Sequence, residues 1–174
     1  MGTGVSGWLL RAGEKRGPGV GLTRRGKGTK LMLVTEGQGI PVGVYLDSAQ
    51  KAEVHLAART LETVKVSHGP GRPRTRPKHL IADRGYDSRA FRAYLRGRGI
   101  GATIPPIRRR GRRRVGRPIH TDWARYGQRW IIERTNAWLQ NYRRVLVRHE
   151  RLLDTYRAFV LLACTMIALG GLSK

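Results

Sequence analysis

Two acidic side chains occupy positions from which a carboxylate can take part in chemistry. Asp83 directly follows a short apolar stretch, residues 79–82, and Glu133 lies in a segment with helical periodicity. A carboxylate held at the end of a strand or on a helix can bind a divalent cation or carry a proton. Each residue also has a plainer explanation. Asp83 can be a turn aspartate, and Glu133 can form a weak surface ion pair with Arg129.

The segment around Glu133 is expected to form a helix with two unlike faces. At 100° per residue, the polar face carries Glu133 together with Tyr126, Arg129, Asn136, Gln140 and Arg144. The opposite face is apolar and includes Ile131, Ile132, Trp138, Leu139 and Val145. Such a helix packs by its apolar face, so Trp138 is expected in the core, and it presents one carboxylate among cations. Trp123 and Trp130 are left unassigned between packing and base stacking.

The elements that must position these carboxylates follow an α/β order with mixed strand directions. Residues 1–28 show no lasting apolar period and are expected to form a loop-rich or disordered arm. Two apolar runs, 31–34 and 40–46, flank a glycine-containing turn and predict a β-hairpin. The remaining elements are expected as a helix at 52–64, a strand at 79–82, a helix at 89–98, a strand at 100–104, a basic loop at 105–125, and helices at about 126–150 and 153–169.

The charge of the chain indicates a polyanionic partner. Its 174 residues carry 35 Lys and Arg against 11 Asp and Glu, a formal net charge of +24. Nucleic acid is the first expectation, because arginine binds phosphate in a bidentate manner. Seven arginines crowd residues 108–117 and are expected to contact phosphates without distinguishing bases. They are Arg108, Arg109, Arg110, Arg112, Arg113, Arg114 and Arg117.

Several classes of protein are excluded at this stage. The single cysteine, Cys164, cannot form an internal disulfide, and no Cys/His group has the spacing of a zinc site. The longest apolar run, residues 158–169, is shorter than the ~20 residues that span a bilayer. The basic block lacks the interleaved large apolar residues of a membrane-surface helix, so an anionic-membrane binder is disfavoured. A cytoplasmic protein that binds nucleic acid is expected.

Two sequence segments resemble those of a known family. Residues 83–88 read Asp-Arg-Gly-Tyr-Asp-Ser, and residues 126–139 run from Tyr126 through Arg129 and Glu133 to Leu139. Together they resemble the DDE-type transposases of bacterial insertion sequences, in the group that includes insertion sequence five. That group carries a Tyr-x2-Arg-x3-Glu-x6-Lys signature, in which this chain has Gln140 at the place of the lysine. The resemblance covers roughly residues 20–170.

The resemblance implies a fold, a chemistry and a partner. Residues 29–174 would form a partial RNase H-like catalytic domain, a mixed sheet flanked by helices. In this family three carboxylates hold two Mg²⁺ or Mn²⁺ ions for cleavage and strand transfer of double-stranded DNA. Asp83 and Glu133 would be the second and third carboxylates, both catalytic and metal-binding. DNA contacts would come from Tyr126, Arg129, Gln140, Arg144 and the seven arginines of the basic block. A nucleoid-associated location in a bacterium follows.

The first carboxylate of the family has no counterpart that the sequence reveals. It would stand on the first strand, before a segment like residues 19–30. The only acidic residue in 1–18 is Glu14, which lies among Gly, Lys and Arg. We therefore expect that the first strand is missing, through decay, a split frame or a misplaced start. Such a chain alone is expected not to cleave DNA, and to self-associate or pair with a full-length transposase. The alternative is a non-enzymatic nucleic-acid-binding protein or a regulator of transposition.

Overall fold

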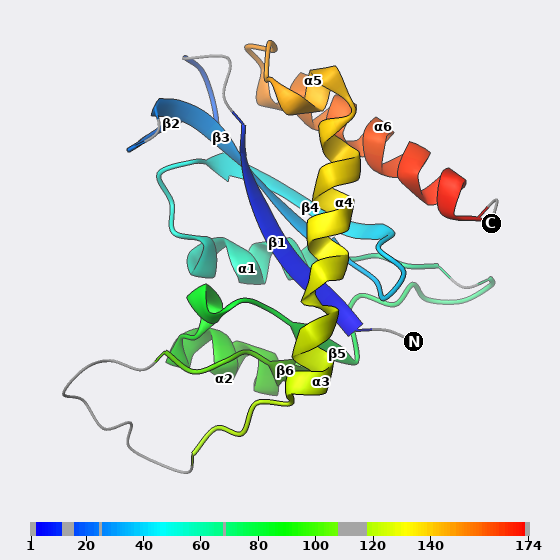
Figure 1. Cartoon of the computed structure of the whole chain (residues 1–174). Coiled ribbons are helices and arrows are strands. Elements are labelled where there is room, and N and C mark those ends of the chain that lie inside the picture. The colour runs from blue at the N-terminus through cyan, green and yellow to red at the C-terminus, as the bar shows by residue number, and fades with distance from the viewer. Residues whose placement is uncertain (1–2, 12–15, 25, 68, 108–117, 173–174) are drawn as a thin grey trace.

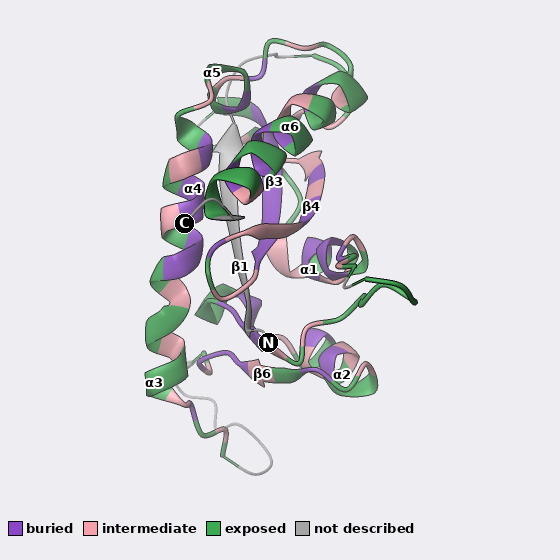
Figure 2. Ribbon diagram, turned by 90° about the vertical axis from the view of Figure 1, so that its right-hand side faces the viewer, coloured by how far each residue is buried: buried purple, intermediate pink, exposed green. Residues whose placement is uncertain are grey.

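A central mixed sheet lies between two layers of helices in the computed structural model of the chain (Figures 1 and 2). The structure describes residues 3–11, 16–24, 26–67, 69–107 and 118–172, and for 3–11 and 172 it describes the backbone. Helices α1 (Glu53–Glu62) and α2 (Arg89–Gly97) cover one face of the sheet. Helices α4 (Trp130–Gln140) and α6 (Leu153–Leu172) cover the other.

The sheet has six strands in the described residues, in the order β2-β3-β1-β5-β6, with β4 paired to β3. Their bounds are β1 Thr3–Arg11, β2 Gly21–Thr23, β3 Gly26–Thr35, β4 Pro41–Ser48, β5 His79–Ile81 and β6 Gly101–Thr103. β3 is antiparallel to β1, β2 and β4, whereas β5 is parallel to both β1 and β6. The hairpin β3–β4 and the strands β5 and β6 confirm the predicted order.

The N-terminal segment differs from the expectation. Thr3–Arg11 is not part of a loop-rich arm but forms β1, which lies at the centre of the sheet (Figure 1). A strand is therefore present in the segment where the sequence was expected to supply none. Two glycines in the strand, Gly4 and Gly7, hid it from the sequence, because glycine lowers strand propensity. Pairing with β3 on one side and β5 on the other supplies the stability that the local sequence does not indicate.

The prediction of one continuous helix at 126–150 is also wrong. The structure divides it into α3 (Trp123–Tyr126), a 3₁₀ turn η2 (Gly127–Arg129), α4 and α5 (Arg143–Leu146). Helix α5 ends at Leu146, and the carbonyl of Val145 near this end accepts a 2.8 Å hydrogen bond from the buried hydroxyl of Tyr156. Leu139 before the break and Val145 after it both pack into the same core cluster, together with Tyr156 and Val160 of α6.

Alternation along β3 divides the core between the two faces of the sheet. Leu31 and Leu33 pack towards α4 and α6, whereas Met32 and Val34 pack towards α1 and α2. These four side chains are at most 1% exposed, so β3 is buried on both faces, as in a sheet with helices on both sides. The sheet is therefore the rigid frame to which both candidate carboxylates are attached.

Helix α6 is apolar over most of its length. Tyr156 and Val160 are fully buried against the sheet, while Leu162 and Leu169 are more than half exposed. Among the described residues, α6 alone is both long enough and apolar enough to cross a membrane, and 28% of its most apolar stretch is buried in the fold. Core helices of soluble proteins have the same length and composition, so these two properties do not assign α6 to a membrane.

Candidate functional site

Asp83 begins the short 3₁₀ turn η1 (Arg84–Tyr86), directly after β5. Its Oδ1 accepts a 2.6 Å hydrogen bond from the Arg84 amide, so the residue caps the turn. The side chain is exposed at the sheet edge. The two interpretations of Asp83 are therefore compatible, because a turn aspartate also presents its carboxylate from a fixed backbone.

Tyr126 of α3 reaches this carboxylate from a distant part of the sequence. Its hydroxyl donates a 3.3 Å hydrogen bond to Asp83 Oδ1 across 43 residues. Partial burial and the negative charge of Asp83 both raise the pKa of the Tyr126 phenol. The phenol consequently stays neutral over the physiological range and acts as a hydrogen-bond donor to the carboxylate.

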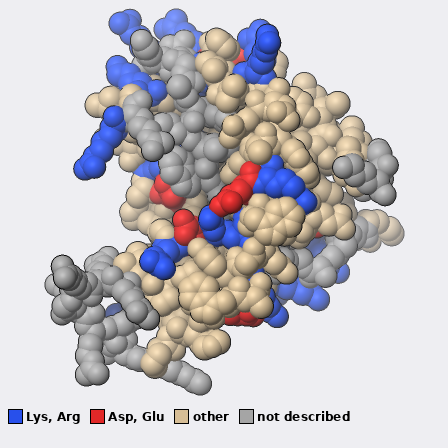
Figure 3. All heavy atoms as spheres, in the orientation of Figure 1, with Lys and Arg blue, Asp and Glu red and all other residues tan. Residues whose placement is uncertain are grey.

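Glu133 lies two turns further along, in the first turn of α4. One of its oxygens is 2.5 Å from Arg129 Nη2, and the Arg129 guanidinium carbon lies 6.0 Å from the centre of the Tyr126 ring. The plain ion pair weighed from the sequence is thus present. The structure connects Asp83, Tyr126, Arg129 and Glu133 in one row, and Figure 3 shows acidic side chains among Lys and Arg in the middle of this face.

The hairpin turn between β3 and β4 holds α4 in place, a contact the sequence did not reveal. Thr135 Oγ1 donates a 2.7 Å hydrogen bond to the Gly39 carbonyl, and Arg134 Nη2 donates one of 2.6 Å to the Gln38 carbonyl. Both bonds span 96 residues. No local pattern predicts such a contact between residues so far apart, and it buries Thr135 completely. These bonds fix the height of Glu133 along the sheet.

Among the described residues, no further carboxylate stands beside Asp83 and Glu133 to complete the expected set of three. Burial raises the pKa of the Glu53 carboxyl, and the nearby negative charge of Asp83 adds to this rise. Glu53 is nevertheless engaged by Lys30, whose Nζ lies 3.6 Å from Glu53 Oε1. β1, next to β5 in the sheet, contains neither Asp nor Glu. Among the described residues no group of three His, Cys, Asp or Glu could hold a metal ion. The residues present therefore do not fit a complete two-ion site.

The expected DNA-binding residues divide into three groups. Tyr126 and Arg129 lie at the site, and Gln140 is exposed at the end of α4. Arg144 lies beyond the helix break in α5, so its expected place on the Glu133 face is wrong; its Nη1 is 3.0 Å from Glu150 Oε1. The seven arginines of residues 108–117 lie outside the described residues.

Three further side chains show how α4 packs. Asn136, expected on the exposed face, is 9% exposed, which corrects that expectation. Trp138 is partly buried against the core, as expected. Trp130 is 53% exposed and lies 4.6 Å from the Arg134 guanidinium carbon, with Trp138 at 4.8 Å from the same carbon. The two indoles therefore hold Arg134, which in turn binds the hairpin.

Comparison with known proteins bears directly on this row of residues. A family model described as the transposase DDE domain matches residues 10–168, which include Asp83, Tyr126, Arg129 and Glu133. A putative transposase for insertion sequence element IS402 from Burkholderia cepacia is 34% identical over 148 residues, 84% of this chain. The chain spans 65% of that relative's length.

Two other relatives support the same assignment. A putative transposase for insertion sequence element IS6501 from Brucella ovis is 31% identical over 144 residues, covering 80% of this chain and 96% of the relative. A cryo-EM structure of piggyBac transposase in a synaptic complex with hairpin DNA has a TM-score of 0.54. It shares 10% identity and covers 93% of this chain and 45% of that one, a likeness of fold alone. The chain belongs to the DDE transposase domain family of insertion sequence elements.

Proposed function

We propose that this chain acts on DNA in the transposition of an insertion sequence, with Asp83 and Glu133 as two carboxylates of the family's active site. One observation carries the proposal. Residues from the turn after β5 and from α3, η2 and α4, up to 50 positions apart, meet in a single row in which Tyr126 and Arg129 bind the two carboxylates. Tyr126 and Arg129 are positioning residues in this account.

As part of the same proposal, we assign the sheet to the RNase H-like class. The supporting observations are a central β1 with an antiparallel neighbour, β3, and a parallel one, β5, and helices on both faces. In that arrangement Asp83 stands at the end of the strand next to β1, and Glu133 stands on a helix that packs on the same sheet.

The chain by itself is proposed to bind DNA without cutting it. The family implies divalent metal ions, Mg²⁺ or Mn²⁺, whose charge stabilises the attacking and leaving oxygens of a phosphodiester. Of the 11 acidic residues, all except Glu14 lie among the described residues, where Asp83 and Glu133 have no third carboxylate that would complete a metal site. Cleavage would then require a further carboxylate.

A regulatory role is the second candidate, and the Arg129–Glu133 ion pair favours it. With Glu133 bound by Arg129 and the site incomplete, the chain would occupy element DNA or pair with a full-length transposase without reaction. Added to a transposition reaction, the chain would then lower the yield of the full-length enzyme. An unchanged yield at concentrations that saturate the DNA would exclude this role.

Binding to DNA is tested by titrating the purified chain against a fluorescent duplex at several salt concentrations. Because the contacts are expected to be with phosphates, log K should fall linearly with log [NaCl], with a slope of about −0.9 for each phosphate neutralised. Glu133→Gln removes a negative charge from the site and should bind at least as tightly as the unaltered chain. Affinity that does not change with salt would contradict the proposal.

A further inference from the structure

A basic segment between α1 and β5 lies outside the row of Asp83 and Glu133. Residues 72–78, here named the basic connector, read Arg-Pro-Arg-Thr-Arg-Pro-Lys, with a cation at every second position. The sequence has no acidic residue between Glu62 and Asp83, so no acid within this stretch neutralises these charges. These cations lie 30 or more positions before the arginine-rich residues 108–117, in which phosphate contacts were expected.

The basic connector has a fixed backbone. Arg74 exchanges two 2.9 Å backbone hydrogen bonds with Val66, which ties the connector to the end of α1. Arg98 donates a 3.0 Å bond to the Thr75 carbonyl, and Arg76 donates one of 2.5 Å to the Arg98 carbonyl. Pro73 and Pro77 restrict φ further. A ligand that binds here meets a backbone that is already ordered, which lowers the entropic cost of binding.

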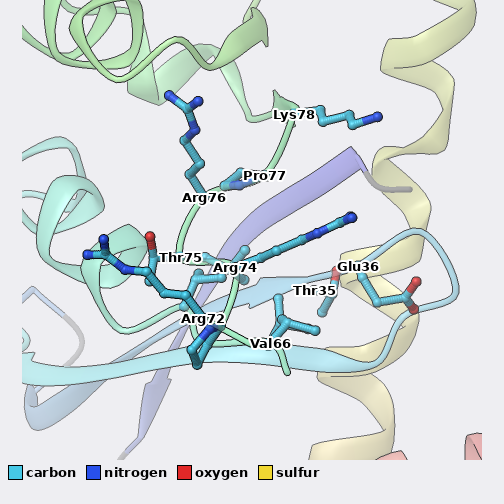
Figure 4. A pocket seen from close by; sticks show the side chains of 13 residues that line it. Thr35, Glu36, Val66, Arg72, Arg74, Thr75, Arg76, Pro77 and Lys78 are labelled. Carbon is cyan, nitrogen blue, oxygen red and sulfur yellow. The ribbon is translucent and has the colours of Figure 1, made fainter. Parts of the chain in front are cut away.

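The cations of the connector are exposed around a trough. Arg72, Arg74, Arg76 and Lys78 are all exposed. Beside them lies a trough of about 530 Å³ with an apolar floor that includes Val34, Val42, Val64 and Val66. In Figure 4 the side chains of Arg74 and Lys78 point to the side on which Glu36 lies, whereas Arg72 and Arg76 point away from it. The side chains of Arg72 and Lys78 have no hydrogen bond or ion pair with any described residue.

We propose that the basic connector is a phosphate-binding site for duplex DNA, separate from the carboxylate row and from residues 108–117. The four cations leave the connector towards both of its sides, and all four side chains are exposed. One DNA strand presents a phosphate for about every 3.4 Å of helix rise, so a duplex that lies along the segment offers a phosphate near each long cationic side chain. Contacts of this kind carry no base information. The inference rests on the proposed function, because that function makes DNA the partner.

The test replaces the two cations that have no partner among the described residues. The double variant Arg72→Gln/Lys78→Gln in the full chain is compared with the unaltered protein on a fluorescent duplex of about 20 base pairs, roughly two helical turns of DNA. The matched control, Lys27→Gln/Arg89→Gln, removes one exposed Lys and one exposed Arg on β3 and α2. A charge-retaining variant, Arg72→Lys/Lys78→Arg, separates loss of charge from loss of fold, and thermal melting followed by circular dichroism checks all four proteins.

The expected result is a change in the salt dependence of binding. Losing two phosphate contacts should make the slope of log K against log [NaCl] shallower by about 1.8, with weaker binding at low salt. The charge-retaining variant should keep the slope of the unaltered chain, and the connector should act equally on A·T-rich and G·C-rich duplexes. If the connector variant and the control lose affinity equally, or if the connector acts only on A·T-rich DNA, the proposal is wrong. Failure of the unaltered chain to bind any duplex would instead contradict the proposed function.

Discussion

The two carboxylates of the site owe their positions to polar contacts with neighbouring side chains. Asp83 accepts from the Arg84 amide and from the Tyr126 hydroxyl, and Glu133 is bound by Arg129. The sequence predicted the carboxylates and their two partners from spacing and from resemblance. It could not predict that Tyr126 donates to Asp83, because that bond depends on the height at which α3 meets the end of β5.

Substitution Tyr126→Phe tests how much this bond stabilises the fold. The bond is long, 3.3 Å, and its acceptor Asp83 is exposed, so its loss should lower the free energy of unfolding by about 0.5 kcal/mol or less. Urea denaturation measures the difference. Tyr142→Phe is the matched control, since Tyr142 packs against the core and its hydroxyl has no hydrogen-bond partner among the described residues. A loss of several kcal/mol for Tyr126→Phe alone would show that the tyrosine is a core residue and not a positioning residue.

At the scale of elements, the hairpin turn between β3 and β4 determines where α4 stands. Gly39 adopts φ +93°, and a Cβ at this position would lie 2.9 Å from Thr135 Oγ1. The turn therefore needs glycine both for its backbone conformation and for the close approach of α4. Glu133 lies two residues before Thr135, so the turn and the carboxylate are mechanically linked.

Gly39→Ala should destabilise the fold by more than about 1 kcal/mol, because it combines a positive φ with a steric clash. Gly97→Ala is the control, and it is expected to change the stability of the fold in the opposite direction. Gly97 ends α2 without a positive φ, and a Cβ added there would meet no atom within 4 Å, so alanine should stabilise the helix by up to about 1 kcal/mol. Thermal melting of both variants decides. Equal, small shifts would mean that the turn does not hold α4.

A buried arginine joins the N-terminal part of the chain to the loop before α6. Arg148 is 1% exposed and donates hydrogen bonds to the carbonyls of Pro18 and Arg151 and to Thr29 Oγ1. Arg148→Met would leave the buried Thr29 hydroxyl and the partly buried carbonyls without this donor, so the free energy of unfolding should fall by at least about 2 kcal/mol. Arg157→Met, on the exposed side of α6, should change it by less than about 0.5 kcal/mol. Urea denaturation that gave equal losses would contradict this role for Arg148.

The same elements show how far the sequence could predict the fold. Local patterns were sufficient for the β3–β4 hairpin, α1, α2 and β5, because each has its own apolar period or a cap such as Ser88, whose hydroxyl accepts from the Phe91 amide. β1 was missed, since its stability comes from two neighbouring strands and its sequence is rich in glycine. The break between α4 and α5 was missed because it serves the packing of Tyr156, which lies beyond it in α6.

Considered as a whole molecule, the chain combines a strongly basic surface with an incomplete acidic site. The sheet places β1 between β3 and β5, where a carboxylate on β1 would be near Asp83. Val5 pairs with Ile81, so Gly7 stands level with Asp83 two residues further along. Gly7 also pairs with Leu33, which packs on the face that carries α4 and Glu133. Position 7 is therefore where the fold would place a third acid beside Asp83 and Glu133.

Nicking of a supercoiled plasmid that carries the DNA flanking the gene, in the presence of Mn²⁺, is the most direct test of this account. The unaltered chain should bind the plasmid and nick it no faster than its Glu133→Ala variant. Gly7→Asp should confer metal-dependent nicking, and Glu133→Ala added to Gly7→Asp should abolish it. If the unaltered chain nicks the plasmid as fast as Gly7→Asp and loses that activity with Glu133→Ala, the site is complete without an acid on β1 and the account is wrong.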